Sequence, residues 1–453
     1  MGSQWRARWK AFAAIRLIEA RGRSADALSA KRCGKAGRLE NMARITKLLQ
    51  DMRASYWFVP GLMMVVAFLL AVGIEALDRH FSNLYTPMLR DWMTTQSDAV
   101  RSLLSVIAQS VITVTGVLFS MTVVAVSFAS SNFGPRLIGN FMRDRGTQIS
   151  LGVLISTFVF ALATLRSVQD FGADGLTFVP LLSLVLALVM TFASVIVMIY
   201  FIHHVPEMIN LENLCHKLGS KLQSQLIELC QANGSASLGD EIESDWMKET
   251  EGQDPKPIFL KTAGYVQAVD FNQITKTAAK NDLNIEVIAV PGQFVHPQRP
   301  ALKVYPEEPL SESTEAQLRA CFATGAGKTD TQNVMFVAQQ LVEIIARALS
   351  PSVNDPYTAC TCLNWLHASL QELAVSETVA IARCPSHHVK IPPVTFHQLL
   401  HITHVDSRQY ILGDIMVKRH AEMLLQELAR QLPPGPRFDA VKHELDTLQQ
   451  DHQ

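Results

Sequence analysis

Long apolar segments alternate with mixed sequence in the first half of the chain. The four longest lie within residues 56–204, at about 57–77, 103–129, 149–165 and 178–202. A helix needs roughly 20 apolar residues to cross the hydrocarbon core of a bilayer, and these segments reach that range. The polar sequence between them is too short to shield them from water. The pattern therefore predicts a membrane α-helical protein with four transmembrane helices.

Basic residues flank these segments unevenly. Before Trp57 the chain carries thirteen Lys and Arg and four acidic residues. The connection after the second segment carries Arg136, Arg143 and Arg145 with one acid, Asp144, whereas the other two connections have no basic excess. Loops rich in Lys and Arg stay on the cytoplasmic side of a membrane. We therefore predict a multi-pass protein with both termini in the cytoplasm.

The second apolar segment carries small and polar residues at helical spacing. At about 100° per residue, nine of them fall within a stripe about 80° wide. The nine are Asp98, Ser102, Ser105, Gln109, Thr113, Gly116, Ser120, Ser127 and Ser131. Val123 and Val124 interrupt the stripe, and Ser110, Thr115 and Thr122 lie outside it. The alignment predicts one distinct polar face along the helix.

Two arrangements would use such a face. In a helix bundle, small residues allow close approach of helices, and hydroxyl groups bond across the contact. In an oligomer around an axis, the same face would line a water-filled path. The length of the stripe and the cost of burying Gln109 favour the path. Asp98 would then stand at its outer mouth, and Asn132 and Arg136 at its cytoplasmic mouth.

The sequence after residue 204 is typical of a soluble domain. Leucines recur every three or four residues over 205–232, which predicts an amphipathic connecting helix. A polar, turn-rich linker is expected over 233–257. Residues 258–453 predict a cytoplasmic α+β domain that opens with strand, helix and strand, the helix being capped by Asp270. Asp355 before Pro356 predicts the start of a later helix.

Charge and cysteine content limit the possible partners and the redox compartment of the protein. The net charge of −1 argues against nucleic acid as a partner. The seven cysteines have no paired spacing, as expected of free thiols in a reducing compartment. Residues 1–55 are strongly basic. They either bind an anionic membrane surface or, in part, precede a true start at Met42.

One segment has the glycine and lysine pattern of a phosphate-binding loop. It is FATGAGKTDT, residues 322–331. A phosphate loop needs an earlier glycine, where Phe322 stands, and a preceding strand, but the sequence before Phe322 predicts a helix. We therefore interpret Gly325 and Gly327 as the end of that helix.

Histidines form the second candidate group. His397, His401 and His404 share one helical face, with Cys384, His387 and His388 nearby. Such a set could bind zinc, although no carboxylate stands where a zinc hydrolase requires one. The alternative is that these histidines are at the surface or packed. His203 and His204, at the end of the fourth segment, could sense pH or contact lipid headgroups.

Three blocks of the chain resemble a bacterial family. They are SFASSNFGPRLIGNFMRDRGTQISLG, KTAGYVQAVD and VAQQLVEIIARALSPSVNDPYTA. The family is the predicted membrane proteins grouped as domain of unknown function 2254, and the similarity extends over about residues 56–430. It implies four helices in a bacterial inner (plasma) membrane, then a cytoplasmic α+β domain, and no agreed activity. In the family's middle block an acid usually follows the glutamine and a glycine follows the phenylalanine. Here these positions hold Asn333 and Val337, which weakens any role assigned to that block.

Two hypotheses of function follow. The first is an oligomeric channel or pore for ions or small solutes, lined by the second segment and gated by the cytoplasmic domain. Its partners would be the lipid bilayer and further copies of the chain. The second is a membrane-anchored sensor or scaffold whose cytoplasmic domain binds a ligand or a protein. Neither hypothesis needs a cofactor or an enzymatic activity, and a metal-dependent enzyme would rest on the histidines alone.

Overall fold

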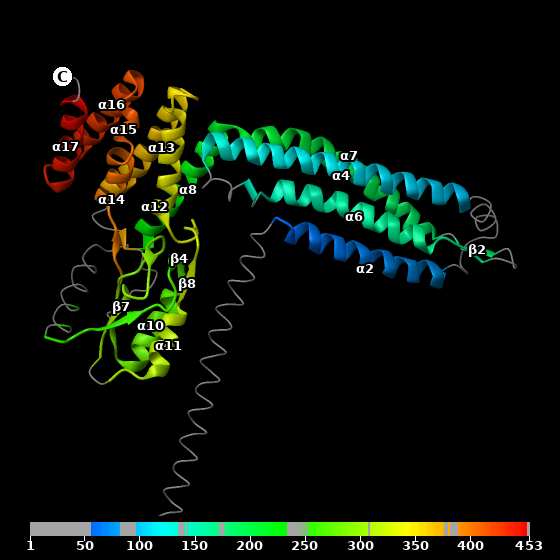
Figure 1. Cartoon of the computed structure of the whole chain (residues 1–453), viewed down its shortest axis with the longest axis horizontal. Helices are drawn as coiled ribbons and strands as arrows, with labels where there is room; N and C mark the ends of the chain where they lie inside the picture. The colour runs from blue at the N-terminus through cyan, green and yellow to red at the C-terminus, as the bar shows by residue number, and fades with distance from the viewer. Residues whose placement is uncertain are drawn as a thin grey trace, which may run out of the picture.

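The computed structural model describes residues 56–81, 97–134, 141–142, 144–171, 176–178, 180–232, 246, 250, 252–306, 309–375, 379–380 and 388–450. The basic segment 1–55, with both candidate starts, and most of the expected linker 233–257 lie outside this set. The described residues form an elongated helical bundle and an extramembrane domain at one end of it (Figure 1). We call the two ends of the bundle the domain-side end and the distal end.

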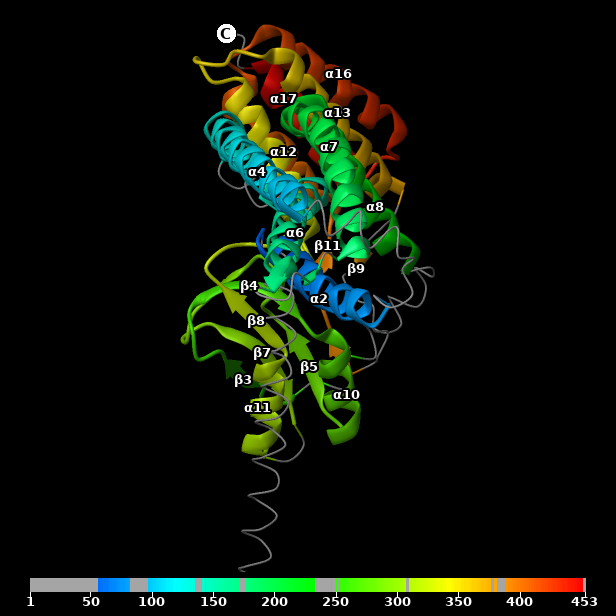
Figure 2. The ribbon, with the colours of Figure 1, turned by 90° about the vertical axis from the view of Figure 1, so that its right-hand side faces the viewer.

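Four helices of the bundle are long and apolar enough to cross a membrane. They are α2 (Phe58–Phe81), α4 (Ser97–Phe133), α6 (Arg145–Ser167) and α7 (Leu181–Ile209). Each corresponds to one predicted segment, so the prediction of four helices is confirmed. Seen along the bundle, α6 lies between α2 on one side and α4 and α7 on the other (Figure 2).

Small and hydroxyl residues make α6 the central helix. Of its apolar span, 56% is buried inside the chain, compared with 28% or less for the other three. A Cβ at Gly152 would collide with Met63 of α2, so the two helices approach closely there. On another face, Thr157 shares a 2.8 Å hydrogen bond with Ser194 of α7. Small residues and interhelical hydroxyl bonds are the usual means of packing helices in lipid.

A buried carboxylate joins α2 to α7 at the distal end of the bundle. A short hairpin, β1 (Gln169–Phe171) and β2 (Leu176–Phe178), joins α6 to α7. Beside it, Asp78 of α2 is 1% exposed and accepts bonds of 3.0 Å from the backbone N–H groups of Leu182 and Ser183. These N–H groups lie in the first turn of α7, where they have no partner within the helix. Asp78 therefore fixes the start of α7 against α2.

The extramembrane domain has a helical part next to the bundle. Its helices are α8 (Leu211–Ala232), α12 (Val334–Ala348), α13 (Pro356–Val375), α14 (Phe396–Leu400), the π-helix η3 (His401–Val405), α15 (Arg408–Ile411), α16 (Ile415–Gln431) and α17 (Pro436–Gln450). They share one apolar core. As predicted, α8 is amphipathic, and its inward face buries Leu214, Leu218, Leu222 and Leu226. The expected start at Pro356 is also present, because Asp355 accepts a bond from the Thr358 N–H.

The second part of this domain contains the sheets. Its elements are β3 (Lys256–Phe259), β4 (Gly264–Val269), α10 (Phe271–Asn281), β5 (Asn284–Val287), β6 (Phe294–Val295), β7 (Pro300–Tyr305), α11 (Glu312–Ala320), β8 (Phe322–Gly325), β9 (Val379–Ala380), β10 (Val389–Lys390) and β11 (Pro393–Val394). Strands pair in the orders β10-β5-β7-β3, β6-β4-β8 and β11-β9. The chain is thus a four-helix membrane protein followed by an α+β domain, as expected.

The predicted strand–helix–strand unit is present with an unexpected pairing. It consists of β4, α10 and β5, and Asp270 caps α10 by accepting a 3.0 Å bond from the Gln273 N–H. However, β4 and β5 belong to different sheets. The chain passes from one sheet to the other through α10, so this unit joins the two sheets rather than forming one.

Candidate functional site

The helix α4 has one face turned into the bundle. Its buried residues recur every three or four positions and pack against α6 and α7. They are Leu104, Ile107, Ala108, Val111, Thr115, Leu118, Thr122, Ala125 and Ala129. The two threonines on this face donate their hydroxyls to backbone oxygens one turn back, Thr115 to Val111 and Thr122 to Leu118. Polar groups that face the bundle are therefore satisfied within the helix itself.

The predicted polar stripe lies on the other side of α4. All nine of its residues are exposed: Asp98, Ser102, Ser105, Gln109, Thr113, Gly116, Ser120, Ser127 and Ser131. On a helical projection the stripe and the buried face are centred about 160° apart. The stripe thus points away from α2, α6 and α7 of its own chain. Packing within the bundle does not explain these residues.

The surroundings of Gly116 support this view. A Cβ added at Gly116 would meet no atom within 4 Å. Glycine is among the weaker helix formers. Close packing inside the chain does not require it at this position. Thr113 and Ser131 donate their hydroxyls to the backbone oxygens of Gln109 and Ser127. Their oxygen lone pairs remain available to whatever covers this face.

The two ends of the stripe differ in what the structure describes. At the distal end, Asp98 lies in the first turn of α4 and is exposed. At the domain-side end, Asn132 belongs to α4, but its side chain and all of Arg136 lie outside the described residues. The proposed cytoplasmic mouth therefore stays a prediction.

The last turns of α4 contact the extramembrane domain. Ala129 belongs to the same core as the residues of α8, α12 and α13, and Val126 packs against that core. Gly134, at φ +113°, ends the helix, and a Cβ there would collide with the Glu343 side chain of α12. A displacement of α4 along its axis would therefore press on α12.

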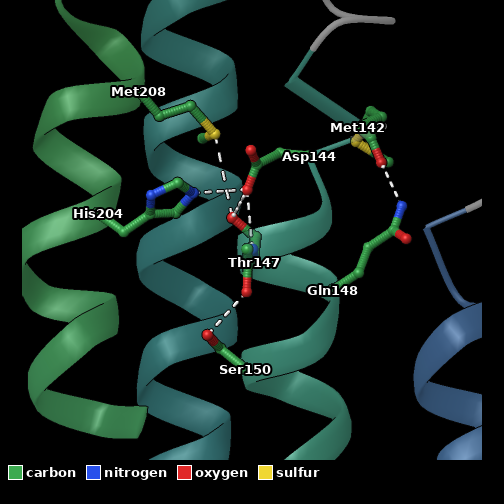
Figure 3. A network of polar contacts seen from close by, with 8 residues as sticks. Met142, Asp144, Thr147, Gln148, Ser150, His204 and Met208 are labelled. Carbon is green, nitrogen blue, oxygen red and sulfur yellow. Dashed lines mark hydrogen bonds and ion pairs between the residues drawn. The ribbon is translucent and has the colours of Figure 1, made fainter.

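Sequence reasoning did not find the polar network at the domain-side end of α6 (Figure 3). Asp144 caps α6 by accepting a 2.8 Å bond from the Thr147 N–H, and the same oxygen lies 2.7 Å from His204 Nε2 on α7. Burial alone would raise the pKa of Asp144, but the bonds from Thr147 and His204 outweigh it and lower that pKa. The ring of Tyr200 stacks on His204 at 5.1 Å. His204 thus ties α7 to α6.

The three candidate zinc-binding histidines do not converge. His397 is exposed, and His401 lies 3.3 Å from Asp406. His404 is 1% exposed, and neither of its ring nitrogens has a hydrogen-bond partner. Its burial lowers its pKa to about 3. In the described part of the chain, no three metal-ligating side chains group together, whereas Cys384 and His387 lie outside that part.

The glycine-rich segment 322–331 also differs from its prediction. The helix α11 ends at Ala320, and Phe322–Gly325 is the strand β8, so the interpretation of Gly325 and Gly327 as the end of the helix is wrong. The residues before this strand are helical as predicted, but the helix stops at Ala320 and the chain continues as a strand that pairs with β4. Lys328 donates to Gln339, and Thr329 donates to the backbone oxygen of Gln267. The two side chains that would hold a phosphate are thus bonded within the protein.

Fold and site together define a membrane protein with four spanning helices, an outward polar face on α4 and a large extramembrane domain. The chain belongs to the family of predicted membrane proteins named domain of unknown function 2254, whose model matches residues 53–427. It is similar to the uncharacterized proteins Mb1321c of Mycobacterium bovis and Rv1290c of Mycobacterium tuberculosis. Each is 28% identical over 365 residues, which cover 78% of this chain and 67% of the relative. No solved structure matches this chain.

Proposed function

We propose that the protein is an oligomeric channel or pore for ions or small solutes, lined by the polar stripe of α4. The observation that carries the proposal is the exposure of all nine stripe residues. From Asp98 to Ser131 the stripe extends about 50 Å at the helical rise of 1.5 Å per residue. It is therefore longer than the hydrocarbon core of about 30 Å.

The energetics of lipid contact support a covered face. Polar groups at membrane depth are tolerated where they are buried in protein or line a water-filled cavity. Beside the stripe, α4 also exposes apolar residues suited to lipid, among them Val117 at 64% and Phe128 at 54%. The outer surface of α4 thus has one side suited to lipid and one unsuited to it. Further copies of the chain around an axis would cover the second side.

The extramembrane domain would control the path. The contact of α4 with α12, and the continuation of α7 into α8, give two physical links from the membrane helices to this domain. The basic excess near the domain-side end favours a cytoplasmic position for the domain and both termini. In a bacterium the membrane would then be the inner one. The proposal includes no enzymatic activity and no cofactor.

Ion flux through the purified protein in liposomes tests the proposal. Gly116→Trp places a large side chain on the stripe, where the monomer has open space. We expect it to abolish flux in a protein that still assembles. The matched control is Gly73→Trp on α2, because a Cβ at Gly73 also meets no atom within 4 Å. Equal loss in both variants, or no flux in the wild type, would instead favour the sensor or scaffold hypothesis.

A further inference from the structure

Two buried cysteines from distant parts of the sequence meet inside the extramembrane domain. Cys215 lies on α8 and Cys362 on α13, and both are 0% exposed. Their sulfur atoms are 3.1 Å apart. A disulfide has an S–S length of about 2.05 Å, so closing the bond requires an approach of about 1 Å. This distance is within reach of small rotations of the two side chains.

Tight packing fixes the two helices in this register. Gly219 of α8 faces Trp365 of α13 so closely that a Cβ would collide with the indole ring. The ring of His216 lies 5.2 Å from the same indole. One or two turns further along, Gln223 donates a 3.4 Å bond to Glu372. The thiol contact is thus part of a continuous interface between α8 and α13.

The pKa values of the two thiols are shifted in opposite directions. The hydrogen bond from Cys362 lowers the pKa of Cys215 and outweighs the opposing effect of burial. Burial, together with that same bond, raises the pKa of Cys362. Because the thiolate is the nucleophile, Cys215 is the sulfur that reacts first. Cys362 is then in place to attack it.

We propose that Cys215 and Cys362 form a redox pair that hydrogen peroxide converts to an intrachain disulfide. The Cys215 thiolate attacks one peroxide oxygen, the O–O bond breaks, and Cys215 becomes a sulfenic acid with loss of hydroxide. The Cys362 sulfur then attacks the Cys215 sulfur and displaces water. In sum, two thiols and one hydrogen peroxide give one disulfide and two waters. Burial favours an oxidant as small as peroxide over bulky reagents.

The disulfide would act on the joint between membrane and domain. The helix α8 begins two residues after the end of α7, and α13 lies in the core of the extramembrane domain. A covalent bond between them would hold α7 and this domain in one relative position. It would also close a loop between residues 147 apart in sequence, and long loops gain most from closure in the unfolded state. Oxidation should therefore raise the melting temperature.

Peptide mapping of the purified full chain tests the pair. After treatment with hydrogen peroxide, denaturation, alkylation and digestion without reductant, the Cys215 peptide should be linked to the Cys362 peptide. The linked mass should be two hydrogens below the sum of the free peptides. The melting temperature should rise and should return on reduction. Among the five cysteines that the structure describes, a bulky aromatic disulfide should modify only the half-buried Cys230 and Cys360.

Two variants complete the test. Cys362→Ser should prevent the link, whereas Cys360→Ser, on the same helix, should leave it unchanged. Alkylation of both Cys215 and Cys362 after full oxidation of Cys230 and Cys360 would overturn the proposal. So would a link from Cys215 to another cysteine, or an unchanged melting temperature in the linked protein. None of these results depends on whether the protein conducts ions.

Discussion

The helices α4 and α6 both carry rows of polar residues within the membrane, but the row on α6 faces the bundle and the stripe of α4 faces away from it. Ser150, Thr157 and Thr164 of α6 are buried inside the chain. The stripe residues of α4 are exposed. A row of polar positions on a membrane helix can thus serve packing within the chain or contact with a partner or water. The placement of the neighbouring helices determines which of the two applies. On α6 the row packs the chain together, and on α4 it is left for a partner or for water.

The largest loss in the free energy of unfolding should come from removing a buried carboxylate, Asp78. Asp78→Ala leaves the Leu182 and Ser183 N–H groups without their acceptor, which should cost about 3 kcal/mol in the free energy of unfolding. Thermal unfolding in detergent measures it. The control is Asp98→Ala at the same end of the bundle, where exposure predicts a change within about 0.5 kcal/mol. A larger loss for the Asp98 variant would reverse the comparison.

Next in size is the capping carboxylate of α6. Asp144→Ala removes the cap and the bond to His204, and should cost about 2 kcal/mol, the upper range for a cap. Because the native pKa of Asp144 is lowered, its contribution is present above the ordinary carboxyl pKa. It is lost as pH falls through the lowered value. The difference between wild type and variant should therefore shrink in acid, and a difference that grows there would contradict this account.

A smaller effect is expected at the contact of α6 and α7. Ser194→Ala breaks the 2.8 Å bond with Thr157 and should lower the free energy of unfolding by about 1 kcal/mol. Ser120→Ala on the stripe should leave it unchanged within about 0.5 kcal/mol. Detergent unfolding of the two variants side by side makes the comparison. Equal losses would mean that the stripe also packs within the chain.

The smallest effect on stability is expected from a substitution that tests whether the stripe lines a conducting path. Asp98 is the one formally charged residue among the nine, and a ring of carboxylates favours cations. Asp98→Asn should therefore lower the permeability ratio of potassium to chloride without unfolding the protein. Glu75→Gln on α2 is the control, since Glu75 pairs with Arg79 near the same end. Reversal potentials in planar bilayers measure the ratio, and an unchanged ratio would remove Asp98 from the path.

The sequence predicts those features that depend on local periodicity. The four membrane helices, the amphipathic helix α8 and the cap at Asp270 follow from residue spacing and are all present. The stripe of α4 also follows from spacing. Its direction does not, because it depends on which side α6 and α7 cover. A signal for the central position of α6 exists in the sequence, since its span is the least hydrophobic of the four.

Features that join distant residues could not be predicted from one sequence. His204 meets Asp144 across 60 positions, and Cys215 meets Cys362 across 147. The strand β8 forms by pairing with β4, and no local pattern in the segment before it indicates a strand. In each case tertiary contact, rather than local propensity, determines the structure.

Cysteine accessibility along α4 tests the central claim most directly. The sequence between residues 56 and 202 contains no cysteine, so peptide mapping distinguishes a cysteine introduced there from the native cysteines elsewhere in the chain. A charged, water-soluble thiol reagent should modify Ser105→Cys, Gln109→Cys and Ser120→Cys in liposomes but leave Val117→Cys unmodified. Protection of all stripe positions, or equal modification of Val117→Cys, would show that this face of α4 does not border water.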